Sequence, residues 1–221
     1  MEGADEVMDE RAVTREGDPG NPHGTFGERM LERMNRSHAD VTNWALDLVD
    51  FHAGDRALDI GCGGGATMGR IADRIEAAGG GGHVSGVDHS EVSCATSRRQ
   101  NEAAIRAGSM DVTCASVESL PFPDASFDVV TTVESFYFWP DPPRSLREVA
   151  RVVRPGGRFL LVADVYRRPD LDDEVRENIE RYDLTVLTPD EYVSLLEGAG
   201  FSHATAHLRE GTTWIAVEGV R

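Results

Sequence analysis

The stretch Asp59-Ile60-Gly61-Cys62-Gly63-Gly64-Gly65 decides how the rest of the chain is interpreted. It continues the short apolar run Ala57–Ile60 and precedes a helical pattern over Ala66–Ala78, so it predicts a glycine-rich turn from a strand into a helix. Glycines permit positive φ angles and let a ligand approach the backbone closely. The spacing also satisfies the dinucleotide pattern G-x-G-x-x-G/A, although a tight turn without a ligand fits a single match of this kind as well.

Strand and helix patterns alternate outward from this turn, which predicts a doubly wound α/β fold with a mostly parallel sheet. Further strands are expected at His83–Asp88, Asp111–Val117, Phe127–Glu134 and Arg158–Val165, and helices at Ser90–Ala107 and Pro142–Val153. After a helix that begins at Pro189, the runs Phe201–Leu208 and Thr212–Val220 predict a hairpin at the sheet edge rather than another βαβ unit.

Domain organisation follows from where the composition changes. Residues 1–25 contain few large apolar groups, and we expect a flexible N-terminal arm there. Residues 26–221 are expected to form a single domain, in which 26–52 are helical, 53–165 form the core and 166–221 form a cap and the closing hairpin.

Composition and charge exclude several classes of function. The 221 residues carry a formal net charge of −17, and all 22 basic residues are arginine. The absence of lysine excludes Schiff-base chemistry and a P-loop lysine, and the charge argues against nucleic acid and anionic membranes as partners. No apolar run is long enough for a membrane span, and the acidic N-terminal stretch predicts no signal peptide and a cytoplasmic location.

The three separated cysteines, Cys62, Cys94 and Cys114, predict neither a disulfide framework nor a zinc site.

Two acidic residues strengthen the ligand-binding interpretation of the glycine turn. Asp59 stands inside a strand end, where a carboxylate is costly unless it binds something. Asp88 ends the second strand and is placed to accept hydrogen bonds from two ribose hydroxyls. A ligand that contains adenosine is therefore expected, and an acidic side chain at this point disfavours the 2′-phosphate of NADP. A dehydrogenase remains an alternative, against which the C-terminal hairpin counts.

Four segments in order resemble the class I S-adenosylmethionine-dependent methyltransferases, and together they are highly specific. They are Asp59–Gly65, Gly86–Ser90, Leu120–Val130 and Leu146–Arg158, so the resemblance covers roughly residues 53–165. The resemblance implies a seven-stranded sheet whose last strand is antiparallel, a helical lid over residues 26–52, and S-adenosyl-L-methionine as the cofactor.

The resemblance also assigns roles to individual residues. Asp59 and the backbone of the glycine turn would hold the methionine amino group, Asp88 the ribose hydroxyls, and His89 and Ser116 would lie near the adenine. Ser116 departs from the acidic residue that relatives often carry there. The implied cofactor-binding residues are Asp59, Gly61, Cys62, Gly63, Asp88, His89, Ser116, Val117 and Val133.

The segment Glu134–Asp141 follows the fourth strand, where the family places the methyl acceptor, and four of its residues are aromatic. Glu134 is the candidate acceptor-binding residue or general base, with Tyr137 as a second catalytic candidate; a helix-capping or ion-paired role for Glu134 is equally open. The expected substrate pocket consists of Met34, His38, Glu134, Tyr137 and Trp139. No metal site is expected, because the acidic run Asp170–Glu174 is typical of a solvated helix start. The cysteines do not converge by pattern, which argues against arsenic methylation.

Methyl transfer from S-adenosylmethionine to a small molecule is therefore the predicted function, in a monomer or homodimer. A protein that binds the cofactor without turnover, as a regulatory or partner-dependent subunit, would keep the same motifs and remains the alternative. Methylation of a protein or RNA is a third possibility, which the missing recognition domain and the acidic charge disfavour. The acceptor atom is left open among oxygen, nitrogen, sulfur and carbon.

Overall fold

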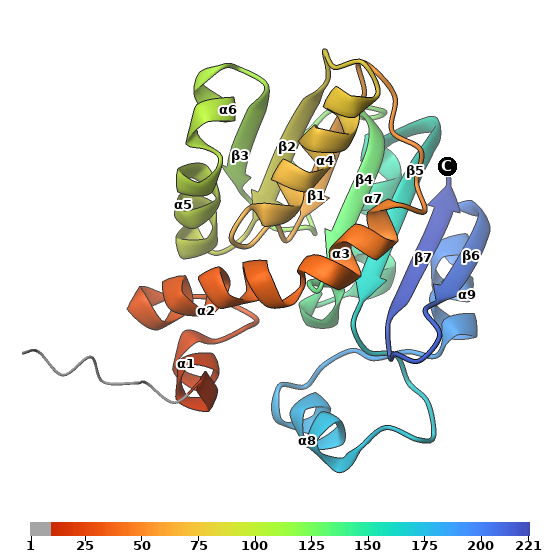
Figure 1. Cartoon of the computed structure of the whole chain (residues 1–221). Coiled ribbons are helices and arrows are strands. Elements are labelled where there is room, and N and C mark those ends of the chain that lie inside the picture. The colour runs from red at the N-terminus through yellow and green to blue at the C-terminus, as the bar shows by residue number, and fades with distance from the viewer. Residues whose placement is uncertain (1–9) are drawn as a thin grey trace, which may run out of the picture.

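The computed structural model describes residues 10–221, and its sheet has the strand order β3-β2-β1-β4-β5-β7-β6 (Figure 1). The strands β1 to β5 run parallel, and β7 is antiparallel to both β5 and β6. This arrangement confirms the predicted seven-stranded, mostly parallel sheet with an antiparallel last strand. The strands are β1 (Arg56–Ile60), β2 (His83–Asp88), β3 (Met110–Cys114), β4 (Phe127–Val133), β5 (Val153–Ala163), β6 (Ser202–Leu208) and β7 (Ile215–Val220).

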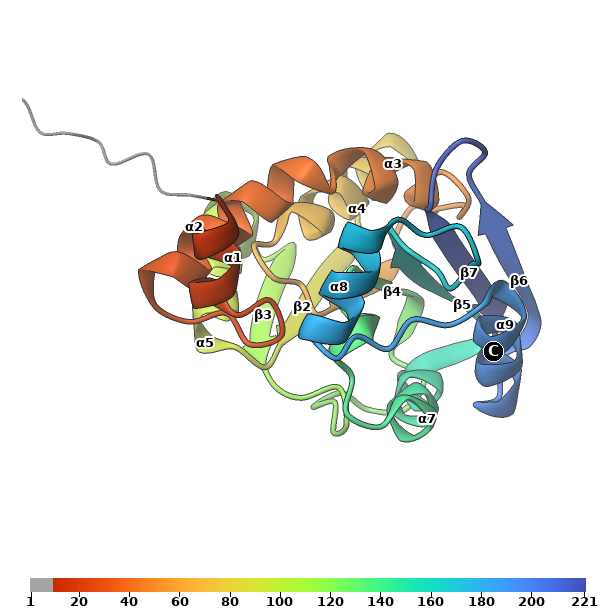
Figure 2. The ribbon, with the colours of Figure 1, turned by 90° about the horizontal axis from the view of Figure 1, so that it is seen from below.

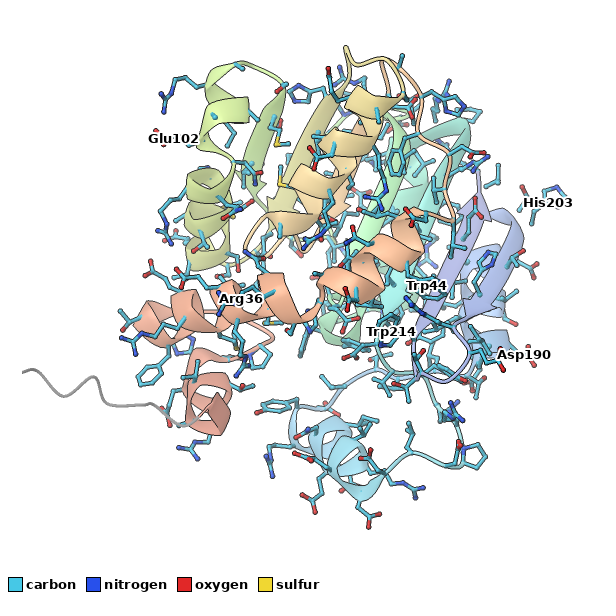
Figure 3. All side chains as sticks on the ribbon, in the orientation of Figure 1. Arg36, Trp44, Glu102, Asp190, His203 and Trp214 are labelled. Carbon is cyan, nitrogen blue, oxygen red and sulfur yellow. A yellow bond between two sulfur atoms is a disulfide. The ribbon has the colours of Figure 1, made fainter. Side chains whose placement is uncertain are left out.

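Helices cover both faces of the sheet and close one core on each side. Side chains alternate across a strand, so in β5 Phe159 and Leu161 enter one core while Leu160 and Val162 enter the other. The helices α7 (Pro142–Val152) and α9 (Pro189–Gly198) close the first core, and α3 (Ala39–Leu46) and α4 (Ala66–Ala77) close the second. On the second face Trp44 of α3 meets Trp214, with ring centroids 6.2 Å apart (Figure 3).

Two predicted helices are broken in the structure. The helix expected over Ser90–Ala107 divides into α5 (Glu91–Gln100) and α6 (Glu102–Arg106) at Asn101, whose side-chain amide donates to the carbonyls of Gly65 and Ser97. The long N-terminal helical region divides at His38 into α2 (Gly24–Ser37) and α3. Both breaks place a polar side chain where the chain turns, beside the glycine turn in the first case and beside the cavity described below in the second.

The N-terminal segment is more structured than the expected flexible arm. Residues 1–9 lie outside the described residues, but α1 (Glu10–Gly17) packs on α2, and Pro22 is buried. The Ser90 hydroxyl donates a 2.5 Å hydrogen bond to the Pro22 carbonyl and so holds this segment against the start of α5. In the view from below, α1, α2 and α8 (Asp173–Arg181) lie on the side of the molecule where the parallel strands end (Figure 2).

The prediction that the cysteines do not converge is wrong for two of them. Cys94 of α5 and Cys114 at the end of β3 form a disulfide, while Cys62 is buried and free. Their spacing in sequence hides this proximity, because it arises from the right-handed crossover that lays α5 against β3.

Within residues 10–221, no helix combines the length and the hydropathy required to span a bilayer.

Gly65 tests how tightly the glycine turn is packed. It is the N-cap of α4 with a φ of +80°, and an added Cβ would lie 2.9 Å from the Ser97 Cα. We expect Gly65→Ala to lower the free energy of unfolding by about 2–4 kcal/mol, because a left-handed backbone and an overpacked contact each cost about 1–3 kcal/mol. Gly108→Ala is the matched control, since Gly108 has a φ of +78° but open space around it. Urea denaturation that gave equal losses for the two variants would contradict the packing argument.

Candidate functional site

A cavity of about 410 Å³ opens at the carboxyl ends of β1, β2 and β4, where the strand order reverses. Ligands bind at this point in doubly wound sheets. Its walls come from the N-terminal segment and α2, the glycine turn, the end of β2, the loop after β3 and the segment after β4. The lining residues used below are Pro19, Gly20, Pro22, Met34, Asn35, His38, Gly61, Cys62, Gly63, Asp88, His89, Ser116, Val117, Glu118, Val133, Glu134, Phe138 and Trp139.

The glycine turn forms the floor of this cavity. The N–H groups of Gly61 and Cys62 both donate to the Val87 carbonyl, at 2.8 and 3.0 Å, which ties the turn to the end of β2. Gly61 has a φ of +71°, and any Cβ there would collide with the Ser135 hydroxyl. The φ of Gly63 is +49°, and its missing side chain leaves the backbone open to a ligand. These positions require glycine for geometric reasons.

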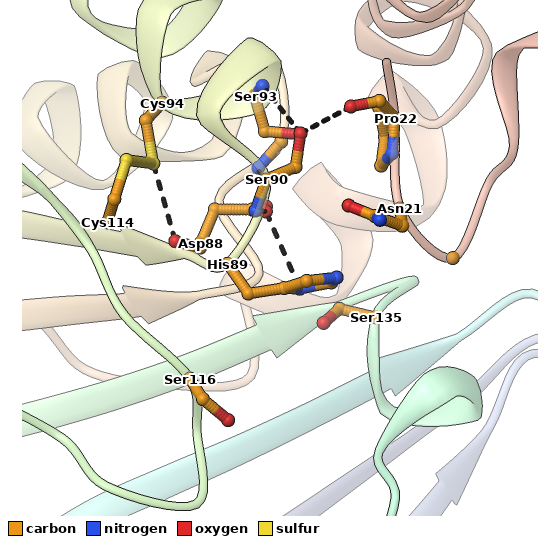
Figure 4. A network of polar contacts seen from close by, with 12 residues as sticks. Asn21, Pro22, Asp88, His89, Ser90, Ser93, Cys94, Cys114, Ser116 and Ser135 are labelled. Carbon is orange, nitrogen blue, oxygen red and sulfur yellow. Dashed lines mark hydrogen bonds and ion pairs between the residues drawn. A yellow bond between two sulfur atoms is a disulfide. The ribbon is translucent and has the colours of Figure 1, made fainter.

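Asp88 stands at the end of β2 with part of its hydrogen-bonding capacity left over (Figure 4). One carboxylate oxygen accepts from the Gly63 N–H at 3.0 Å and the other from the Ser90 N–H at 2.9 Å. Burial raises the pKa of Asp88, whereas these two bonds oppose the rise. Each carboxylate oxygen can accept a second bond, so the side chain suits a ligand that presents two neighbouring hydroxyls.

Asp59 lies beneath the floor of the cavity, outside its wall. Its carboxylate accepts a 2.7 Å hydrogen bond from the Thr131 hydroxyl of β4. Burial raises the pKa of Asp59 to about 7, and the nearby Asp88 adds to the rise. The structure therefore gives Asp59 no direct contact with the cavity, unlike the contact with a methionine amino group that the resemblance implies.

The roof of the cavity is held onto the floor by polar contacts. The Asn35 side chain of α2 donates to the Gly64 carbonyl at 3.2 Å, and Arg70 of α4 donates to the Asn35 carbonyl at 3.2 Å. Pro19, Gly20 and Pro22 extend the roof across the end of β2. The helical region predicted as a lid thus lies over the glycine turn, together with part of the segment expected to be a flexible arm.

Carboxylates gather at the far end of the cavity, next to β4 and β5. Glu134 follows β4 with a φ of +55°, an uncommon conformation for a residue other than glycine. The Tyr137 hydroxyl lies 3.3 Å from Glu134 Oε2 and 3.0 Å from Asp164 Oδ1, and it accepts a hydrogen bond from the Val165 N–H. Burial, followed by the neighbouring Asp164, raises the pKa of Glu134 well above its usual range. Burial also raises the pKa of Tyr137.

Most of the residues predicted for the site meet in this one cavity. All of the expected cofactor-binding residues except Asp59 line it, and so do four of the five residues expected to form the substrate pocket. Tyr137 is the exception in the second group: it is buried behind Glu134 and Asp164 and does not line the cavity. Phe138, one of the aromatic residues of the segment after β4, also lines the cavity.

Asp164 is the residue that the sequence reasoning missed. It follows β5 directly, just as Asp88 ends β2 and Glu134 follows β4. The rule that singled out those two acidic residues, a carboxylate at the carboxyl end of a buried parallel strand, applies equally to Asp164. Its position in the run Val162-Ala163-Asp164 was therefore an available signal.

Comparison with known proteins places these features in a family. A family described as "Methyltransferase domain" matches residues 58–161. The 27-O-demethylrifamycin SV methyltransferase of Amycolatopsis mediterranei is 33% identical over 194 residues, which cover 84% of this chain and 68% of that protein. Methyltransferase GfsG of Streptomyces halstedii is 34% identical over 186 residues, covering 81% of this chain and 60% of the relative.

A solved structure agrees with this placement at the level of the fold. The geranyl diphosphate C-methyltransferase of Streptomyces coelicolor A3(2), determined with Mg²⁺, geranyl diphosphate and S-adenosyl-L-homocysteine, superposes with a TM-score of 0.68. The alignment covers 96% of this chain and 88% of that one at 16% identity.

The raised pKa of Asp59 predicts how stability depends on pH. Between the unfolded value of about 3.9 and the folded value of about 7, the folded chain holds a proton that the unfolded chain has released. The free energy of unfolding therefore falls as the pH rises through this window, by up to about 4 kcal/mol from this group. We expect Asp59→Asn to gain stability relative to the wild type from pH 4 to pH 7 in urea denaturation.

The exposed Asp73 provides the matched control for this experiment, because Asp73→Asn makes the same chemical change in water. A constant difference between Asp59→Asn and the wild type across the window would contradict the assigned pKa.

Proposed function

Because the chain belongs to the class I S-adenosylmethionine-dependent methyltransferases, we propose that it transfers a methyl group to a small-molecule acceptor held beside Glu134. The observation that carries the proposal is the continuity of the cavity. One cavity joins the glycine turn and Asp88 at one end to Glu134 and Trp139 at the other. A donor and an acceptor can therefore lie side by side in it, as an in-line displacement requires.

The residues of the first end fit S-adenosylmethionine. Asp88 retains acceptor capacity for the two ribose hydroxyls, and Gly63 lets the ligand approach the backbone. His89, Ser116 and Val117 line the wall where the adenine would lie. When bound, the cofactor supplies a methyl group on a positively charged sulfonium, so the chain mainly has to align the acceptor and exclude water.

Asp59 acts on this end from below the floor. Asp59 does not line the cavity, but a carboxylate under the glycine turn favours a positively charged ligand above it. We therefore assign Asp59 an electrostatic role through the turn, in place of the contact implied by the resemblance.

The second end is proposed to bind the acceptor. Glu134 lines the cavity and would contact the polar atom that receives the methyl group. Tyr137 would act from behind, as a positioning residue whose hydroxyl holds Glu134 and Asp164 together. The half-buried ring of Phe138 and the buried ring of Trp139 give this end an apolar wall suited to a flat or hydrophobic acceptor.

The names of the relatives support an acceptor of small-molecule type. The rifamycin relative is named as a methyltransferase of 27-O-demethylrifamycin SV, and the Streptomyces coelicolor enzyme is named as a C-methyltransferase of geranyl diphosphate. The net charge of −17 supports the absence of nucleic acid among the partners. A cytoplasmic location, a monomeric or homodimeric state and the absence of membrane binding remain predictions.

The Glu134→Gln variant tests the proposed acceptor end. We expect S-adenosylmethionine affinity, measured by isothermal titration, to stay within about twofold, because the proposed cofactor contacts at Asp88 and Gly63 do not involve the Glu134 side chain. Turnover, measured as S-adenosylhomocysteine released with a pool of small hydroxylated metabolites, should fall at least about 100-fold. Glu177→Gln, on the exposed face of α8, is the control for loss of one carboxylate.

Full activity of Glu134→Gln would remove Glu134 from the mechanism. Tight cofactor binding by the wild type with no methylated product from any pool would instead favour the alternative of a binding protein without turnover. Absence of S-adenosylmethionine binding below about millimolar concentration would overturn the proposed function itself.

A further inference from the structure

Three side chains from three separate parts of the chain converge at the acceptor end of the cavity. His38 lies between α2 and α3, Glu134 follows β4, and Asp164 follows β5. One nitrogen or oxygen atom from each of the three lies within 4.8 Å of the atoms from the other two. The proposed cofactor contacts use none of these residues, and the acceptor role assigned above uses only Glu134.

The carboxyl groups of this cluster have more acceptor atoms than the neighbouring donors can serve. Glu134 Oε1 is inaccessible to solvent and has no hydrogen-bond partner. The Tyr137 hydroxyl lies within reach of both carboxyl groups but carries a single proton. The salt bridges between arginines and carboxylates within residues 10–221 involve carboxylates other than those of Glu134 and Asp164. The cluster is therefore short of positive charge and of donors.

The His38 imidazole is half-buried and, within the described part of the chain, makes no hydrogen bond to a protein group. A neutral imidazole carries a lone pair on one ring nitrogen. A neutral imidazole beside two carboxylates is a donor set that divalent transition metals accept.

We propose that His38, Glu134 and Asp164 bind one divalent cation of the Mn²⁺ or Zn²⁺ class at the acceptor end of the cavity. Ligand atoms at about 2.0–2.2 Å from such an ion lie about 3–4 Å apart, so small side-chain rotations bring the three atoms into range. Three protein ligands leave coordination positions open. His38 and Glu134 both line the cavity, so an open position faces the proposed acceptor and suits an oxygen atom of that molecule.

A cation satisfies the cluster better than a proton does. A proton shared by Glu134 and Asp164 would join the two carboxyl groups but would not involve the His38 ring. A divalent ion would neutralise both carboxylates, use the imidazole lone pair and satisfy Glu134 Oε1 in one step. The sequence expectation of no metal site considered only the acidic run after β5, because spacing in sequence does not bring these three residues together.

The cation site stands on the geometry alone, and only its role in holding the acceptor rests on the proposed function. The test is therefore a direct titration with Mn²⁺. The full chain is first freed of metal with a chelator, and Mn²⁺ binding is then measured by electron paramagnetic resonance. We expect one Mn²⁺ bound per chain, displaced by Zn²⁺. His38→Gln, Glu134→Gln and Asp164→Asn should each weaken Mn²⁺ binding at least about tenfold, and the exposed control Glu177→Gln should leave it unchanged.

Three results would overturn the cation site. They are absence of Mn²⁺ and Zn²⁺ binding up to millimolar concentration, binding that all three variants retain, and equal losses in Glu177→Gln. Glu134→Gln and Asp164→Asn preserve the shape of the side chain. Circular dichroism of each variant separates a folding defect from the loss of a metal ligand. Titration with S-adenosylmethionine runs in parallel. If the wild type binds S-adenosylmethionine and turns over but binds neither Mn²⁺ nor Zn²⁺, only the cation site is rejected. If the wild type binds Mn²⁺ at these residues but does not bind S-adenosylmethionine, only the proposed function is rejected.

Discussion

The Val87 carbonyl is the acceptor on which the site depends, because it receives the N–H groups of both Gly61 and Cys62. This pair of hydrogen bonds bends the chain sharply after β1 and joins the ends of two neighbouring strands. The neighbouring contacts of the cavity floor and roof are positioned from that bend. Gly63 is brought to the carboxylate of Asp88, and Asn35 finds the Gly64 carbonyl beneath α2. The floor of the cavity, the Asp88 carboxylate and the roof are thus positioned by the same backbone turn.

The sequence was sufficient for the architecture because the signals that decide it are local. Hydrophobic alternation and turn residues located the strands, and the carboxylates at strand ends located the cavity. The failures involve contacts between distant segments. The pairing of Cys94 with Cys114 depends on how α5 crosses the sheet, and Pro22 is held by the hydroxyl of Ser90, which caps α5. Neither periodicity nor composition carries information about such contacts.

The same distinction between local signals and distant contacts holds for the site residues. Asp88 and Glu134 could be found because each ends a strand, and Asp164 obeys the same rule. The side chains of Asp59 and Tyr137 were harder to place, because sequence spacing does not tell whether a residue lies on a cavity wall or one layer behind it. Both turned out to lie behind the wall, one bonded to Thr131 and the other to Glu134 and Asp164. Their influence on a ligand is electrostatic or indirect.

The Ser90 hydroxyl serves two parts of the molecule at once. It donates to the Pro22 carbonyl, and it accepts the Ser93 N–H and so caps α5. Pro19, Gly20 and Pro22 form part of the cavity wall. The first turn of α5 and the position of this wall are therefore coupled through a single side chain.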